Sequence, residues 1–222
     1  MINTARLYSL LLTLILSLFS LSLYAEPTSD ASGEDIKVRI TKDLPYVDFV
    51  LNGKKIRIER IQDTSNHLNN SFSKTSRPCP PFCIRPISIG KVKTVGELEL
   101  LDFLQNKVAK GEGVLIDARI PQWFEKGSIP GAINIPFNIL NSITHEKYNN
   151  KILSLLGVTE GEDGKDFSNA KELLIFCNGA WCSQATRAIT LLISQGYPEE
   201  KLYWYRGGIH AWLSLGFNIT KP

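Results

Sequence analysis

The sequence has almost no excess of charge of either sign. It holds 25 Lys and Arg residues against 22 Asp and Glu residues among its 222 residues, a formal net charge of +3. A balance this even argues against a surface that binds nucleic acid or another polyanion. Histidine is also scarce, and His67, His145 and His210 show no spacing typical of a metal site. Neither a metal nor another cofactor is therefore expected.

The chain lacks a long apolar run anywhere except at its start. Arg6 precedes a leucine-rich segment over residues 7–23, and Ala25 offers a small residue at a cleavage point. This pattern is typical of a secretory signal peptide over residues 1–25 and predicts a periplasmic or secreted mature chain. The alternative is an uncleaved membrane anchor, because the run is near the lower length limit for a membrane span.

Residues 26–91 are predicted to form an extension outside the main domain. Its first part, residues 26–34, is rich in Pro, Ser, Asp and Gly and indicates a flexible lead. Over residues 36–61 apolar side chains alternate with charged ones, and Asn52-Gly53 is a strong hairpin signal. We therefore expect a small antiparallel β unit that packs on the main domain or on a protein partner.

The extension ends in a proline-rich segment with two cysteines, Cys79 and Cys83. Prolines restrict the loop between them, which suits a local disulfide in an oxidising compartment, and this is the preferred interpretation. Two alternatives stay open. A metal site is disfavoured because a zinc knuckle usually has two residues between its cysteines. A redox-active pair that serves the second pair of cysteines is the other.

Residues 92–222 alternate between strand and helix patterns, which predicts a parallel α/β sheet flanked by helices. Thr94 and Glu97 form a capping-box pattern ahead of an apolar helical face that includes Leu98 and stops at Gly111. Apolar runs predict buried strands at residues 114–116, 173–176 and 202–205.

The loop after residues 173–176 is where we expect the chemistry. Cys177 stands at the carboxyl end of that strand, the edge where open α/β sheets bind ligands. The loop continues through Asn178, Gly179, Ala180, Trp181, Cys182 and Ser183, and a helix pattern follows. Amide groups and the dipole at a helix N-terminus favour negative charge, so Cys177 is predicted to be an accessible, nucleophilic thiolate. Arg187, one turn into the helix, either adds positive charge or lies on a solvated face.

Three separated motifs occur in the order found in the rhodanese (sulfurtransferase) domain family, which the sequence resembles over about residues 92–219. The motifs are residues 116–119 with 127–136, Phe176-Cys177 with its loop, and residues 206–212. The extension is similar to that of exported single-domain bacterial rhodaneses. The resemblance implies that Cys177 takes a sulfane sulfur from a small donor, holds it as a persulfide, and passes it to a thiol or protein acceptor. Asp117 and Arg119 are assigned to the scaffold.

Two positions depart from the family pattern. Ser128 stands where the family usually has His, in a motif that is structural, so no catalytic consequence is expected. Members that use thiosulfate commonly carry Arg or Lys in the loop, and this chain has neither between Cys177 and Ser183. Poor use of thiosulfate is therefore predicted, since a dianion gains little from amides alone.

Other functions compete with sulfur transfer. A tyrosine or dual-specificity phosphatase needs Arg six residues after its cysteine, where this chain has Ser183. A thiol–disulfide oxidoreductase would pair Cys177 with Cys182, although two intervening residues are usual rather than four. A non-catalytic binding module with a buried Cys177 is the third alternative. Cys182 is either a resolving thiol for Cys177 or a small residue at the helix start.

Overall fold

The computed structural model describes residues 36–221, apart from residues 70, 141–145 and 163. The predicted signal peptide and the lead at 26–34 lie outside the described residues. Within the described part, no helix is long and apolar enough to span a membrane. The fold given below is that of the compact unit that begins at Lys37.

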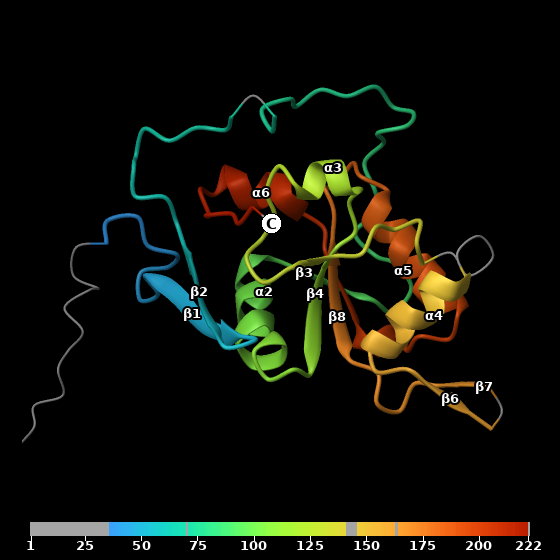
Figure 1. Ribbon diagram of the computed structural model, residues 1–222. Helices are drawn as coiled ribbons and strands as arrows, with labels where there is room; N and C mark the ends of the chain where they lie inside the picture. Colours follow the sequence, from blue (N-terminus) through green and yellow to red (C-terminus); the bar gives the residue numbers. More distant parts are fainter. Residues whose placement is uncertain (1–35, 70, 141–145, 163, 222) are drawn as a thin grey trace, which may run out of the picture. The chain divides into compact units, whose positions relative to one another are not determined.

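A five-stranded parallel sheet lies at the centre of this unit (Figure 1). Every neighbouring pair of its strands runs parallel, which confirms the predicted parallel α/β sheet. The strand order is β3-β9-β8-β4-β5. The strands are β3 (Lys93–Val95), β4 (Gly113–Asp117), β5 (Ile133–Asn134), β8 (Glu172–Phe176) and β9 (Leu202–Tyr205).

The helices cover both faces of the sheet, and β8 shows why its sequence is apolar throughout. Leu173 and Ile175 pack into a core that includes residues of α5, whereas Leu174 and Phe176 pack into a second core with residues of α2 and α6. A strand buried on both faces cannot alternate with polar residues. The helical segments are α2 (Glu97–Phe103), the π-helical η1 (Leu104–Val108), α3 (Pro121–Phe124), α4 (Glu146–Leu155), α5 (Gln184–Ser194), η2 (Glu199–Lys201) and α6 (Gly208–Ser214).

The predicted start of α2 is wrong in detail. The helix is capped at Gly96, whose amide donates to the Glu99 carboxylate over 3.0 Å. Thr94 lies in β3, and its hydroxyl donates instead to the carbonyl of Ile87. Leu98, expected on the buried face, is 51% exposed, because the face of α2 that packs inward carries Leu100, Leu101 and Phe103.

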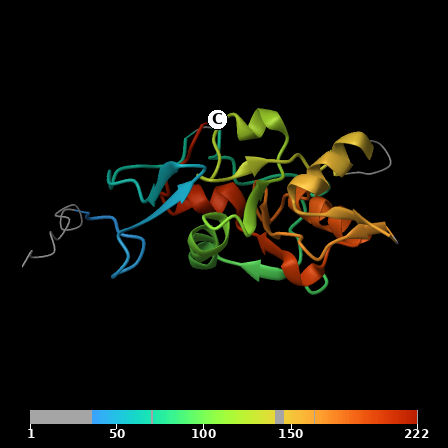
Figure 2. The same cartoon turned by 60° about the horizontal axis from the view of Figure 1, so that its bottom comes forward.

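The N-terminal extension contains the predicted hairpin, formed by β1 (Tyr46–Leu51) and β2 (Lys54–Glu59). Asn52 and Gly53 both have positive φ, at 50° and 76°, as a two-residue hairpin turn requires. The expected strand pattern at residues 36–40 forms bends instead. In both views the hairpin lies beside α2 (Figures 1 and 2), and Val47, Phe49 and Ile58 are buried in the same core as Leu104. The hairpin therefore packs on the main domain.

A second, two-stranded hairpin separates α4 from β8. It consists of β6 (Thr159–Gly161) and β7 (Gly164–Asp166) and lies within the polar insert that the sequence shows before β8.

Candidate active site

The loop between β8 and α5 is held in place by the start of α6. The amide of Ile209 donates to the carbonyl of Cys177 over 3.0 Å, and the amide of His210 donates to the carbonyl of Asn178 over 3.1 Å. Gly208 makes this approach possible, since a Cβ at this position would collide with the Cys177 carbonyl and the Gly179 amide. Its φ of +59° also favours glycine. The last motif of the sequence thus shapes the cysteine loop.

Cys177 lies beneath this loop and is only 2% exposed. The sequence predicted an accessible thiol at Cys177, whereas in the structure this thiol is buried. Burial raises the pKa of Cys177 well above its ordinary value, and the neighbouring Cys182 thiol raises it further. Hydrogen bonds from the amides of Gly179 and Ala185 act in the opposite direction. The amide cradle around the sulfur is present, but desolvation of the thiolate outweighs it.

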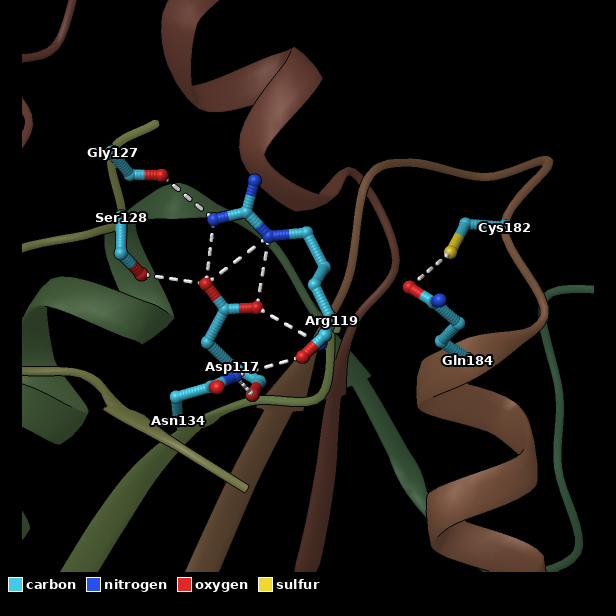
Figure 3. A network of polar contacts seen from close by, with 7 residues as sticks. All are labelled: Asp117, Arg119, Gly127, Ser128, Asn134, Cys182 and Gln184. Atoms are coloured by element: carbon cyan, nitrogen blue, oxygen red, sulfur yellow. Dashed lines mark hydrogen bonds and ion pairs between the residues drawn. The ribbon is translucent and has the colours of Figure 1, made fainter. Parts of the chain in front are cut away.

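Cys182 is the more acidic of the two thiols. Its pKa is lowered to about 7, first by the neighbouring Cys177 thiol, against the opposing effect of burial. The Cys177 Sγ atom itself donates to the backbone carbonyl of Cys182 over 3.5 Å. The amides of Gln184 and Asn178 and the Asn178 side chain also lower it. Its sulfur lies 3.8 Å from the Gln184 Oε1 atom at the start of α5 (Figure 3). The amides of the loop are thus divided between two sulfur atoms, both of them reduced.

Asp117 and Arg119 form a buried ion pair at the end of β4 (Figure 3). The Arg119 guanidinium donates to both carboxylate oxygens and to the carbonyl of Gly127 over 2.7 Å. Ser128, at the position where His is usual, donates its hydroxyl to Asp117 over 2.7 Å. The side-chain amide of Asn134 donates to the carbonyls of both Asp117 and Arg119. These contacts tie β4 to the loop at residues 127–128 and to β5.

A cavity of about 450 Å³ opens beside the cysteine loop. Asn178 and Trp181 of the loop and Ile209 and His210 of α6 form part of its wall. Trp181 is therefore a wall residue of the cavity, and it also packs against the core. Arg187 does not line this cavity; it lies exposed on α5 with its guanidinium 4.4 Å from the centre of the Phe137 ring.

Residues 71–82 of the connector supply the other part of the wall, which the sequence analysis missed. The Arg77 guanidinium lies 3.7 Å above the ring of Trp181. Phe82 packs edge-on against the same indole, with 5.9 Å between ring centroids. No periodic pattern marks either residue in the sequence, so only their place in the structure reveals them.

Backbone contacts fix the connector against the loop. The Arg85 amide donates to the carbonyl of Ala180 over 2.9 Å, and Arg206 donates to the carbonyl of Arg85 over 2.8 Å. Just before these contacts, Cys79 and Cys83 are joined in a disulfide with a Cα–Cα distance of 4.7 Å. The disulfide loop encloses Phe82 and so presents that ring to Trp181. Among the described residues, no group of three His, Cys, Asp or Glu side chains is placed to hold a metal ion.

The sequence model of the rhodanese-like domain family matches residues 100–215 of this chain. The chain belongs to the rhodanese-like domain family. The chain is 27% identical over 117 residues to a tRNA 2-selenouridine synthase of Bordetella bronchiseptica, a match that covers 50% of this chain and 28% of that protein. The chain thus spans well under half the length of that curated relative.

Solved structures of rhodanese-related proteins are also similar. A single-domain sulfurtransferase of Saccharomyces cerevisiae is 23% identical with a TM-score of 0.40, over 56% of this chain and 91% of that one. A rhodanese-related protein of Thermoplasma volcanium is 18% identical with a TM-score of 0.37, over 59% and 99% of the two chains. The family is one of sulfur transfer.

Proposed function

We propose that the protein is a sulfurtransferase that carries a sulfane sulfur as a persulfide on Cys177. The observation that carries this proposal is the position of Cys177 at the carboxyl end of β8 and just before α5, where the amides of Ala185 and Gly179 act to lower the pKa of its thiol. Such amides stabilise negative charge on a bound sulfur. The position is also that of the nucleophile in the family motif. The acceptor is a thiol, either a small molecule or a protein, in the periplasm or outside the cell.

The two thiols divide the work of the transfer. The Cys182 thiolate accepts the proton of Cys177 while the Cys177 sulfur attacks the outer sulfur of the donor. A new S–S bond forms on Cys177, the S–S bond of the donor breaks, and the leaving group departs with the electron pair. An acceptor thiolate then attacks the outer persulfide sulfur, and the released Cys177 thiolate takes its proton back from Cys182. No external oxidant or reductant is consumed.

Burial of Cys177 adds a requirement to this scheme. Because the sulfur is 2% exposed, the donor reaches it only when part of the loop is displaced. When the loop closes again, it excludes water and other nucleophiles from the persulfide on Cys177.

Mass spectrometry of the intact protein tests the proposal. After incubation with a sulfane donor and removal of the excess, the protein should gain the mass of one sulfur, and peptide mapping should place it on Cys177. The Cys177→Ser variant should gain none and turn over no donor, while it keeps the wild-type circular dichroism spectrum. Turnover by a folded Cys177→Ser protein would refute the role of Cys177 as sulfur carrier. A wild-type protein in which Cys177 gains no sulfur from any donor would refute it too and would indicate a non-catalytic binding module.

A second function is favoured by the proximity of two reduced cysteines: the Cys177 Sγ atom lies 3.5 Å from the backbone carbonyl of Cys182. The Cys182 thiolate can attack a persulfide or mixed disulfide on Cys177 and close an internal disulfide, with release of the bound group. Peptide mapping under non-reducing conditions should then show a Cys177–Cys182 linkage after oxidation, and Cys182→Ser should become more sensitive to peroxide. Absence of that linkage, together with unchanged peroxide sensitivity in Cys182→Ser, would exclude the resolving role.

A further inference from the structure

We propose that the connector before the rhodanese domain forms the donor site, and that its ligand is an anionic sulfane-sulfur compound with an apolar body, of the organic thiosulfonate class. Arg77 binds the anionic head group, and the aromatic walls of the cavity hold the apolar body. This inference rests on the proposed function of Cys177 as the sulfur carrier. It assigns to residues 71–82 the charge that the cysteine loop itself lacks.

The charge of the cavity is positive. Arg77 and Lys74 line it, and no Asp or Glu does so among the described residues. The Arg77 Nη1 atom donates to the carbonyls of Lys74 and Thr75, over 2.5 and 3.4 Å. Within the described part of the chain, Arg77 has no carboxylate at ion-pair distance. A guanidinium held by backbone carbonyls and stacked on Trp181 keeps planar N–H donors available for an oxyanion.

The rest of the wall is mostly aromatic. Phe82, 41% exposed, and Trp181 meet on one side, and Phe72 and Trp123 meet on another with 6.2 Å between their centroids. The cavity volume of about 450 Å³ is in the range that holds small organic ligands. Thiosulfate carries no apolar group, so it would leave these rings in contact with water. An aryl or alkyl substituent on the donor removes that apolar surface from water.

His210 supplies an unsatisfied polar group in the same cavity. Its Nε2 atom is buried and has no hydrogen-bond partner among the described residues. Burial, and then the charge of Arg77, lowers the pKa of His210, so the ring is neutral at neutral pH. A buried nitrogen without a partner is costly, and a ligand that fills the cavity can satisfy it.

The cavity is adjacent to the thiol pair. Asn178 lines the cavity, and it is close enough to Cys182 for its amide and side chain to lower the pKa of that thiol. Arg77 is close enough to Cys182 for the two to interact electrostatically. A donor held by Arg77 is therefore next to the loop that carries both cysteines, and it reaches the buried Cys177 when part of that loop is displaced.

The reaction balances without a further reagent. The Cys177 sulfur attacks the terminal sulfur of R–SO₂–S⁻ and its proton passes to the Cys182 thiolate. The bond between the two donor sulfurs breaks, and the sulfinate R–SO₂⁻ leaves with the electron pair. Cys177 is left as the persulfide, and Arg77 remains paired with the sulfinate oxygens until the product departs.

Binding can be measured apart from catalysis. Benzenesulfonate has the ring and the anionic head but no transferable sulfur, and Trp123 and Trp181 report on the cavity through their fluorescence. We expect benzenesulfonate to change the fluorescence of the Cys177→Ser protein in a saturable way. Addition of Arg77→Gln should weaken this binding about tenfold, the effect of losing one charge-assisted hydrogen bond. Arg77→Lys should restore part of it.

Transfer is then compared for two donors. In single-turnover loading followed by mass spectrometry, benzenethiosulfonate should load Cys177 at lower donor concentration than thiosulfate does. Arg77→Gln should raise the half-saturating concentration of both anions about tenfold. Phe82→Ala should raise the half-saturating concentration of benzenethiosulfonate more than that of thiosulfate, and so reduce the advantage of the aromatic donor. The matched control is Arg57→Gln, because Arg57 also stacks on a ring, at 3.8 Å from the centroid of Tyr46, but lies in the hairpin outside the cavity.

The outcomes separate this inference from the proposed function. If Cys177 gains sulfur but Arg77→Gln behaves like Arg57→Gln, the donor site is wrong and the carrier role of Cys177 stands. If Arg77→Gln slows only the unloading of the persulfide to an acceptor thiol, the cavity is an acceptor site and the proposal is likewise overturned. If benzenesulfonate binds through Arg77 but no donor adds sulfur to Cys177, the proposed function fails and the donor assignment fails with it.

Discussion

Replacing Cys177 with alanine should make Cys182 a weaker acid. The neighbouring Cys177 thiol is the largest cause of the lowered pKa of Cys182, about 7 against an ordinary value of 9.0. A shift of this size corresponds to a preference for the thiolate on the order of 3 kcal/mol. Alanine removes the donor and keeps the burial, which alone disfavours the charged form. We expect the pKa of Cys182 to return to its ordinary value or above.

The sign of the change is directly visible in a titration. An acid with a lowered pKa ionises at lower pH, so wild-type protein should show one thiolate forming around neutral pH. In Cys177→Ala that step should move to higher pH, and at pH 7 the thiolate fraction should fall from about one half to about one hundredth or less. Ultraviolet absorbance of the thiolate is the suitable assay, since alkylation rates would also depend on the access to a buried sulfur. Cys79 and Cys83 do not contribute, because they are joined in a disulfide.

Cys182→Ser is the matched control. It leaves Cys177 as the only free thiol, and burial raises the pKa of that thiol, so no thiolate should form near neutral pH. Loading of this variant with sulfur should be slow at neutral pH and should accelerate as the pH rises, because the base that accepts the Cys177 proton is missing. A Cys182 that still titrates near pH 7 in Cys177→Ala would show that the amides, not the thiol pair, set its acidity, and the two-thiol mechanism would be refuted.

Three further predictions concern the scaffold of the site. Replacing both Cys79 and Cys83 with serine should lower the melting temperature modestly, because the closed loop is short, and leave sulfur transfer per folded molecule nearly unchanged at saturating donor; equal stability with lost transfer would instead indicate a redox relay. Gly208→Ala should displace the cysteine loop and abolish sulfur loading of Cys177, while the protein remains folded. Normal loading would contradict the close approach of Gly208 to the Cys177 carbonyl. Arg119→Met should destabilise the fold by about 3–5 kcal/mol in urea unfolding, because Asp117 would be left buried and unpaired; a change below about 1 kcal/mol would contradict this.

Local patterns in the sequence were sufficient for the centre of the fold. β8 could be predicted because its run of apolar residues is bounded by Glu172 and Cys177, and both faces of the strand are covered. The hairpin turn could be predicted because Asn52-Gly53 is among the few pairs that accept two positive φ angles. In both cases the determinant lies within a few residues of the element it determines.

The start of α2 shows how a local pattern fails when a tertiary contact competes for the same side chain. Thr94 and Glu97 have the spacing of a capping box, but so do Gly96 and Glu99. The Thr94 hydroxyl is used by the carbonyl of Ile87, and β3 pairs with β9 over the residues that would otherwise lead into the helix. The second box then forms, with the Gly96 amide as donor.

The donor cavity was beyond prediction because its parts are joined only by contacts between distant segments. Arg77 has no periodic neighbour, and its place over Trp181 depends on the path of the connector, which the Arg85–Ala180 hydrogen bond fixes. A cation missing from the loop sequence is therefore not missing from the site. The prediction of poor thiosulfate use considered only the charges between Cys177 and Ser183. The electrostatic field at the two thiols depends on every charge that the fold brings near them.

The location of the thiolate illustrates the same limit at the scale of single atoms. A helix N-terminus and its amides favour negative charge, and the sequence argument gave that charge to the first cysteine of the loop. In the structure, backbone amides lower the pKa of both sulfurs, but burial raises the pKa of Cys177, whereas the neighbouring Cys177 thiol lowers the pKa of Cys182. The two thiols of one loop thus take different roles, Cys177 as the proton donor and Cys182 as the base. The difference in solvation between them decides which role each one takes, and that difference is a property of packing, which the spacing of two cysteines does not encode.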